Sequence, residues 1–115
     1  MEQEKSFSKF GKTFQEDLCH LVLNDRSFAD QIFEVLDLSF LELKHLRVFI
    51  GKIREYRKKY GVHPTPNIMY SIIRTGLDSE QESVKVRIRE YYARVLASGK
   101  IPDSAEFIKG TALDF

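Results

Sequence analysis

The sequence is poor in several features that would point to particular classes of protein. Its single cysteine, Cys19, excludes a disulfide within the chain and favours a reducing compartment. No apolar run approaches the roughly 18 residues of a membrane-spanning helix, and residues 1–9 lack the apolar core of a signal peptide. The formal net charge of +1 is not the strong basic excess of an autonomous DNA-binding domain, although it allows a local basic face.

Motifs for nucleotide and metal binding are also missing. There is no G-x-x-x-x-G-K-[ST] or G-x-G-x-x-G sequence, and residues 11–13 (Gly-Lys-Thr) lack the upstream glycine and preceding strand of a P-loop. Cys19 and His20 are adjacent but cannot fill a tetrahedral zinc site alone, and neither His45 nor His63 has a histidine four residues away. We therefore expect no catalytic residue, metal site or bound cofactor in this chain, and no enzymatic activity of its own.

What the sequence does contain is apolar residues at helical spacing, most clearly in residues 39–61. The apolar positions of this stretch recur at steps of three and four: Leu43, Leu46, Phe49, Ile50, Ile53, Tyr56 and Tyr60. Ser39 and Glu42 match a capping box, and Gly61 suits a left-handed stop. These signals predict a helix about 30 Å long, against which the shorter helices can pack.

Five further helices are predicted between caps and breakers. Their approximate ranges are 13–24, 28–36, 66–75, 79–98 and 104–113, with Thr13, Ser27, Thr65, Ser79 and Ser104 at their starts and Gly76 and Gly99 as stops. No window alternates apolar and polar residues with strand period. We therefore predict an all-α fold, a compact orthogonal bundle of about six helices around the long central helix.

The length of 115 residues fits one domain with one core. We expect residues 1–12 to form a flexible N-terminal tail and residues 13–115 to form a single helical domain. The last predicted helix runs to the end of the sequence without a polar tail, which suggests either that the polypeptide is truncated within a longer protein or that its last helix packs back on the domain.

Two basic groups are candidates for contact with a partner or with nucleic acid. The first comprises Arg54, Arg57, Lys58 and Lys59 at the end of the central helix, and the second comprises Lys85, Arg87, Arg89 and Arg94. The first group together with Arg87 and Arg94 makes the candidate set of six. Cations interleaved with Tyr56 and Tyr60 could follow phosphates and stack on bases. We favour the simpler interpretation, a solvated face whose late cations complement the helix C-terminus. Both tyrosines fall on the apolar stripe, so we interpret them as core residues.

Five segments, in order, carry a resemblance to a known family. They are Leu21-Val22-Leu23-Asn24-Asp25, Phe28-Ala29-Asp30-Gln31-Ile32, Val35-Leu36-Asp37-Leu38-Ser39-Phe40, His45-x-x-Val48-Phe49 with Ile53, and Tyr60-Gly61-x-x-Pro64-Thr65. Over residues 14–115 the chain resembles the N-terminal domain of DnaB-type replicative DNA helicases, especially the phage versions. It departs from the family at Leu23-Asn24, where a glycine is common, and at Leu46, where arginine often follows the histidine.

The resemblance implies a globular head followed by a helical hairpin and a RecA-like motor domain. Such heads form a collar on the helicase hexamer, help to assemble the ring and recruit primase. The expected partners are therefore other helicase subunits, primase and a helicase loader, with weak direct DNA contact and no membrane. ATP and Mg would belong to the motor domain. The resemblance also implies a cytoplasmic location in a bacterial or phage-infected cell, a chain that stops as the hairpin begins near residues 107–115, and a monomer or weak dimer in isolation.

Two alternatives remain open from the sequence. The chain could be a stand-alone protein that imitates the helicase head and binds or inhibits a replisome component, because no motor sequence is present. It could also be a small helical nucleic-acid-binding protein that uses the basic face, in which case its affinity would fall steeply with salt.

Overall fold

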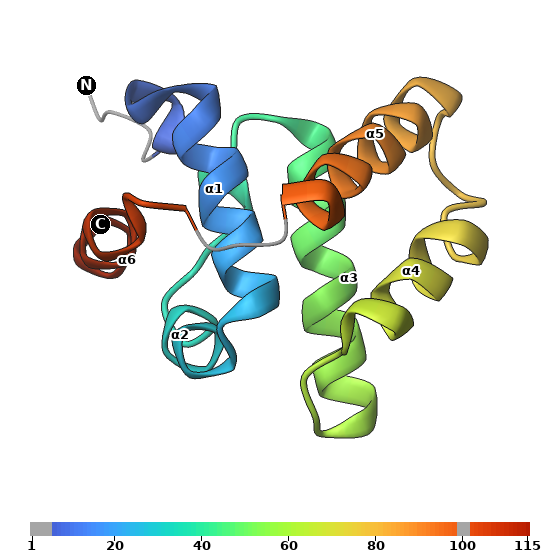
Figure 1. Ribbon diagram of the computed structural model, residues 1–115, viewed down its shortest axis with the longest axis horizontal. Coiled ribbons are helices and arrows are strands. Elements are labelled where there is room, and N and C mark those ends of the chain that lie inside the picture. Colours follow the sequence, from blue (N-terminus) through green and yellow to red (C-terminus); the bar gives the residue numbers. More distant parts are fainter. Residues whose placement is uncertain (1–5, 99–101) are drawn as a thin grey trace.

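The computed structural model describes residues 6–98 and 102–115, and in this part of the chain all regular secondary structure is helical, without a β-strand (Figure 1). The elements are η1 (Phe7–Phe10), α1 (Gly11–Asn24), α2 (Arg26–Ile32), η2 (Leu38–Phe40), α3 (Lys44–Tyr60), α4 (Pro66–Thr75), α5 (Glu82–Ser98) and α6 (Ala105–Asp114), where η denotes a 3-10 helix. The predicted all-α class and the number of helices are confirmed. Within the described ranges no helix combines the length and the apolar character that crossing a membrane requires.

Helix α3 lies in the middle of the bundle and packs against both α1 and α5 (Figure 1). It has 17 residues, which corresponds to about 25 Å. Four apolar side chains of its stripe are almost completely buried: Leu46, Phe49, Ile50 and Ile53. The fold is held together by burial of this kind, at roughly 1.5–3 kcal/mol for each large apolar side chain. The predicted role of this stretch as the central helix is therefore confirmed.

The predicted start of the central helix is wrong. Ser39 lies in η2, where both its backbone N–H and its hydroxyl donate to Asp37 Oδ1, at 2.9 and 2.8 Å. The backbone N–H of Glu42 donates instead to Gln15 Oε1 of α1 at 2.8 Å. With these groups engaged elsewhere, α3 begins at Lys44 after a residue that provides no side-chain cap.

The expected tail also differs from the structure over residues 6–12. Phe7 is fully buried, and its ring centroid lies 5.7 Å from that of Phe40 and 4.6 Å from that of Phe115. Helix α1 begins at Gly11, so Thr13 does not cap it as predicted. Residues 6–12 are thus part of the folded domain, whereas the expectation for residues 1–5 concerns residues outside the described ranges.

Several predicted boundaries of the other helices are confirmed and others are shifted. Gly61 ends α3 with a φ of 73°, and Thr65 caps α4 by accepting the N–H of Ile68 at 3.2 Å. Helix α2 is capped by Asp25 rather than Ser27 and ends at Ile32, short of the predicted position 36. Helix α5 begins at 82, so the predicted cap at 79 is wrong. The predicted stop at 99 lies outside the described residues.

Candidate functional site

Two arginines of the predicted basic face are engaged within the fold. Arg54 Nη2 donates to the backbone carbonyl of Leu36 at 2.8 Å, and Arg57 Nη2 forms an ion pair with Asp30 of α2. Both guanidinium groups lie over the ring of Phe33, with Cζ at 5.7 and 5.3 Å from its centroid. These two side chains therefore attach α3 to the second helix and the segment after it.

His63 extends this set of contacts to the end of α1. Its Nδ1 lies 2.8 Å from Arg57 Nη1, and its Nε2 lies 2.7 Å from the backbone oxygen of Leu23. Because a guanidinium can only donate, Nδ1 accepts the first bond and Nε2–H donates the second, which is the neutral form of the ring. Burial lowers the pKa of His63, and the hydrogen bond from Arg57 lowers the pKa of Asp30.

The lysines that follow are exposed and lie beside an aromatic pair. Lys58 and Lys59 both face solvent, and Lys59 Nζ lies 5.4 Å from the ring centroid of Tyr60. The rings of Tyr56 and Tyr60 have centroids 4.6 Å apart, and Tyr60 is 57% exposed. The interpretation of Tyr60 as a core residue is therefore wrong, because α3 extends past the core at its C-terminal end.

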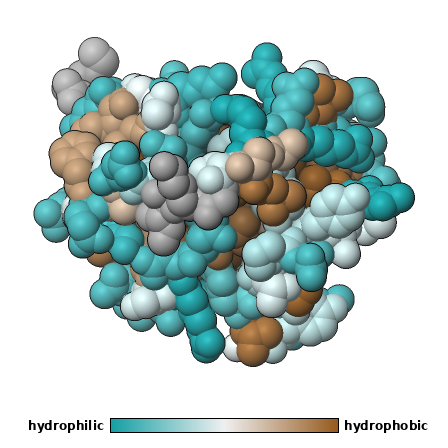
Figure 2. Space-filling model, in the orientation of Figure 1, coloured by the Kyte–Doolittle hydropathy of each residue, from teal (hydrophilic) through white to brown (hydrophobic). Residues whose placement is uncertain are grey.

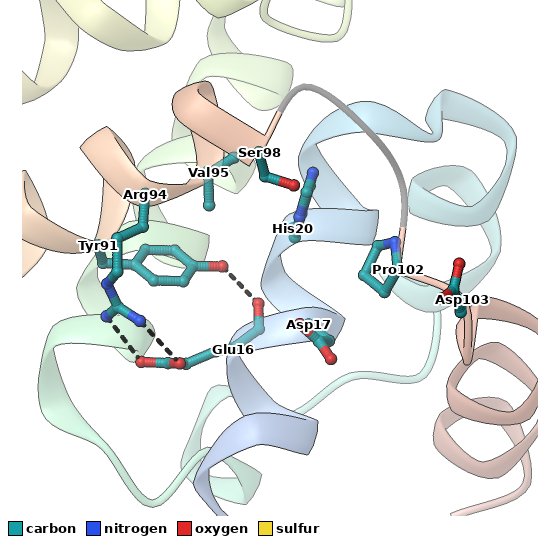
Figure 3. A pocket seen from close by; sticks show the side chains of 9 residues that line it. All are labelled: Glu16, Asp17, His20, Tyr91, Arg94, Val95, Ser98, Pro102 and Asp103. Atoms are coloured by element: carbon teal, nitrogen blue, oxygen red, sulfur yellow. Dashed lines mark hydrogen bonds and ion pairs between the residues drawn. The ribbon is translucent and has the colours of Figure 1, made fainter.

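The second basic group also contains an arginine that is paired within the fold and an arginine that is exposed. Arg94 of α5 binds both carboxylate oxygens of Glu16 on α1, at 3.2 and 3.0 Å, and this raises the pKa of Arg94 (Figure 3). The hydroxyl of the neighbouring Tyr91 donates to the backbone oxygen of Glu16. Arg87 is exposed and forms no ion pair with any described residue. Of the six predicted residues, only Arg87 and the two lysines are thus unpaired cations at the surface, and a role for the six as one face stays a prediction.

A cavity of about 300 Å³ lies next to the Arg94–Glu16 pair, between α1, α5 and the start of the last segment (Figure 3). Asp17 and His20, three residues apart on α1, line it together with Asp103. His20 is only 6% exposed, and burial lowers its pKa while burial raises that of Asp17. No three His, Cys, Asp or Glu side chains within the described ranges are arranged to hold a metal ion. Ser98 lines the cavity as well, and the cavity has room for a small polar molecule.

A second concavity, which the sequence did not single out, lies between α4 and α5. We call it the α4–α5 groove, and its lining consists of Tyr70, Ile73, Arg74, Arg89, Tyr92, Ala93 and Leu96 around a volume of about 310 Å³. Figure 2 shows hydrophobic residues reaching the surface on the side of the molecule where Figure 1 places these two helices. The sequence predicts the helix over residues 66–75 but does not show which of its apolar side chains stays exposed.

The only cysteine is not part of any of these sites. Cys19 is fully buried, and burial raises the pKa of its thiol well above the ordinary value, which keeps the thiol protonated and unreactive.

Comparisons with known protein families, with curated proteins and with solved structures find no match to this chain. The geometry of the described residues is therefore the basis for any functional conclusion.

Proposed function

We propose that this chain is a non-catalytic assembly and protein-interaction domain, related to the N-terminal head of DnaB-type replicative helicases and acting in the hexamer collar and in primase recruitment. The observation that supports this most directly is the position of the residues that carry the resemblance. His45 and Phe49 are both buried on α3, Gly61 ends that helix, and Pro64 lies buried just before α4. Each of these residues thus packs in the core or sets a helix boundary, as it would in a helicase head with the same order of helices.

The surface supports a binding role rather than a catalytic one. Seven large hydrophobic residues are exposed in the described ranges: Val35, Tyr60, Val62, Tyr70, Val86, Leu96 and Phe107. Two of them, Tyr70 and Leu96, line the same groove between α4 and α5, and apolar surface gathered in one place marks interaction sites. The cavities that contain ionisable residues hold several of them in ion pairs, Arg94 with Glu16 in one cavity and Arg57 with Asp30 in another.

Direct nucleic-acid binding is the weaker candidate. A face that follows phosphates needs several cations free to release counterions. Arg54, Arg57 and Arg94 instead bind protein groups, so their charge is largely used inside the domain. The feature that favours testing this candidate is the exposed ring of Tyr60, which lies beside Lys59 and contacts the half-buried Tyr56.

The proposal is tested by affinity capture. The intact chain is immobilised and exposed to an extract of replicating source cells, and bound proteins are identified by mass spectrometry against an unrelated helical domain of similar net charge. We expect enrichment of a replicative helicase, a primase or a helicase loader. Recovery of none of these proteins would contradict the proposal. Fluorescence anisotropy with labelled single-stranded DNA at about 50 and 200 mM salt tests the alternative, which requires a steep loss of affinity.

The reading frame beyond residue 115 separates a collar domain from a stand-alone imitation of the helicase head. A P-loop motif following in the same frame would place the chain in a helicase subunit. A stop codon at that point would favour the imitation, which should then lower the unwinding rate when it is added to the purified helicase.

A further inference from the structure

The floor of the α4–α5 groove is apolar and well ordered by its own contacts. Ile73 and Tyr92 are both buried. The hydroxyl of Tyr92 donates to the backbone oxygen of Pro66 at 2.8 Å, so the polar end of this side chain is already satisfied. The carbon atoms of the ring therefore line the groove, and covering them with another apolar surface would be favourable because it removes them from water.

The two sides of the groove also present apolar surface to solvent. Tyr70 of α4 is 50% exposed and Leu96 of α5 is 49% exposed. Covering such side chains contributes roughly 25 cal/mol for each Å² of apolar surface removed from water. A groove between two helices, with large side chains at its edges, accommodates a third helix better than an extended strand, since the described residues offer no sheet edge for strand pairing.

The charge at the groove has one sign. Arg74 and Arg89 line it, no acidic residue does, and neither arginine lies within ion-pair distance of a described carboxylate. Arg74 Nη1 donates a long hydrogen bond of 3.4 Å to the hydroxyl of Tyr70. Arg57 and Arg94, in contrast, both have carboxylate partners. The groove therefore combines an apolar floor with two guanidinium groups that pair with no carboxylate of the described residues.

We propose that the α4–α5 groove binds an acidic amphipathic helix of a partner protein. Apolar side chains of that helix, spaced three or four residues apart, would enter between Tyr70 and Leu96, and its carboxylates would pair with Arg74 and Arg89. This inference rests on the proposed function, because it names the surface through which the interaction domain acts. A nucleic acid fits less well, since phosphates gain nothing from the apolar floor.

The proposal is tested with a phage-displayed library of helical peptides of about four turns, selected against the intact chain. We expect the enriched peptides to carry leucine, isoleucine or phenylalanine on one face together with aspartate or glutamate. The best peptide is then synthesised with a fluorescent label, and its affinity is measured by anisotropy against the wild-type chain and four variants.

Two variants change the groove and two serve as matched controls. Leu96→Asp and Arg89→Glu should each weaken binding at least about tenfold, through the lost apolar contact and the reversed charge respectively. Val86→Asp, at another exposed apolar residue of α5, and Lys44→Glu, at an exposed cation of α3, should change affinity by less than about twofold. All four positions are at the surface, and circular dichroism checks that each variant is folded.

Three results would overturn the proposal. They are the absence of any enriched peptide, the enrichment of basic peptides, and an affinity that the two groove variants leave unchanged. Sedimentation equilibrium adds a fourth, since self-association of the wild-type chain that Leu96→Asp abolishes would make a second copy the occupant. If the replication protein found by capture binds Leu96→Asp normally, the groove inference fails while the proposed function stands. If a peptide binds at the groove but no replication protein is captured, the groove inference stands while the proposed function fails.

Discussion

Replacing Phe49 by alanine tests whether α3 is the element on which the rest of the fold depends. Phe49 is 1% exposed, and its ring meets those of Tyr91 and Tyr92 on α5, with centroids 5.3 and 5.9 Å away. Truncating a buried phenylalanine removes its transfer free energy and leaves a cavity, at a cost of about 3–5 kcal/mol. For a domain of this length, that loss corresponds to a fall in Tm of about 12–20 °C.

The assay is urea unfolding followed by far-ultraviolet circular dichroism, with thermal unfolding as a second measurement. The matched control is Phe107→Ala, the same chemical change at a residue that is 64% exposed, which should cost less than about 1 kcal/mol. Because the free energy of unfolding of small domains is only about 5–15 kcal/mol, the Phe49 variant should have lost a large part of its stability. Equal free energies of unfolding for the two variants would refute the reasoning that α3 and α5 share one core.

Three further predictions concern the backbone, a buried polar contact and pH. Gly61→Ala should lower the free energy of unfolding by about 1 kcal/mol through left-handed strain alone, because the added methyl group meets no atom within 4 Å, and urea unfolding measures this. Gln15→Leu should cost about 1–3 kcal/mol in the same assay, because the N–H of Glu42 loses its acceptor; an unchanged value would show that this N–H is satisfied otherwise. Burial lowers the pKa of all three histidines, so the unfolded chain binds more protons than the folded one. The free energy of unfolding should therefore be greatest above about pH 6.5 and fall as the pH drops below that value. An equal urea midpoint of unfolding at about pH 7.5 and 5.5 would be evidence against this.

The elements that the sequence predicted well are those decided by nearby residues. The apolar stripe containing Leu46 and Ile53 repeats at helical spacing, and it is buried as its period requires. Gly61 and Thr65 act on the backbone within a few residues of themselves, so their roles as stop and cap also follow from local sequence. Such signals do not depend on how the helices pack.

The features that could not be predicted depend on contacts between distant segments. Ser39 is a good cap by residue type, but Asp37 binds its N–H, and the N–H of Glu42 is taken by Gln15 on another helix. The basic residue Arg57 was identified by charge, yet only the position of α2 shows that it is paired. The α4–α5 groove was missed for the same reason, since no local pattern tells which apolar residue stays half exposed.

The cluster of phenylalanine rings around Phe7 has a consequence for how the domain opens. It joins the first described element to Phe115, and Lys109 of α6 forms an ion pair with Asp25. Fraying of either end would therefore remove apolar cover from the other, so the two ends should exchange their amide hydrogens with solvent as one cooperative unit rather than independently. Because residues 7 and 115 lie far apart along the chain, their contact must close a long loop, and we expect this cluster to form late in folding.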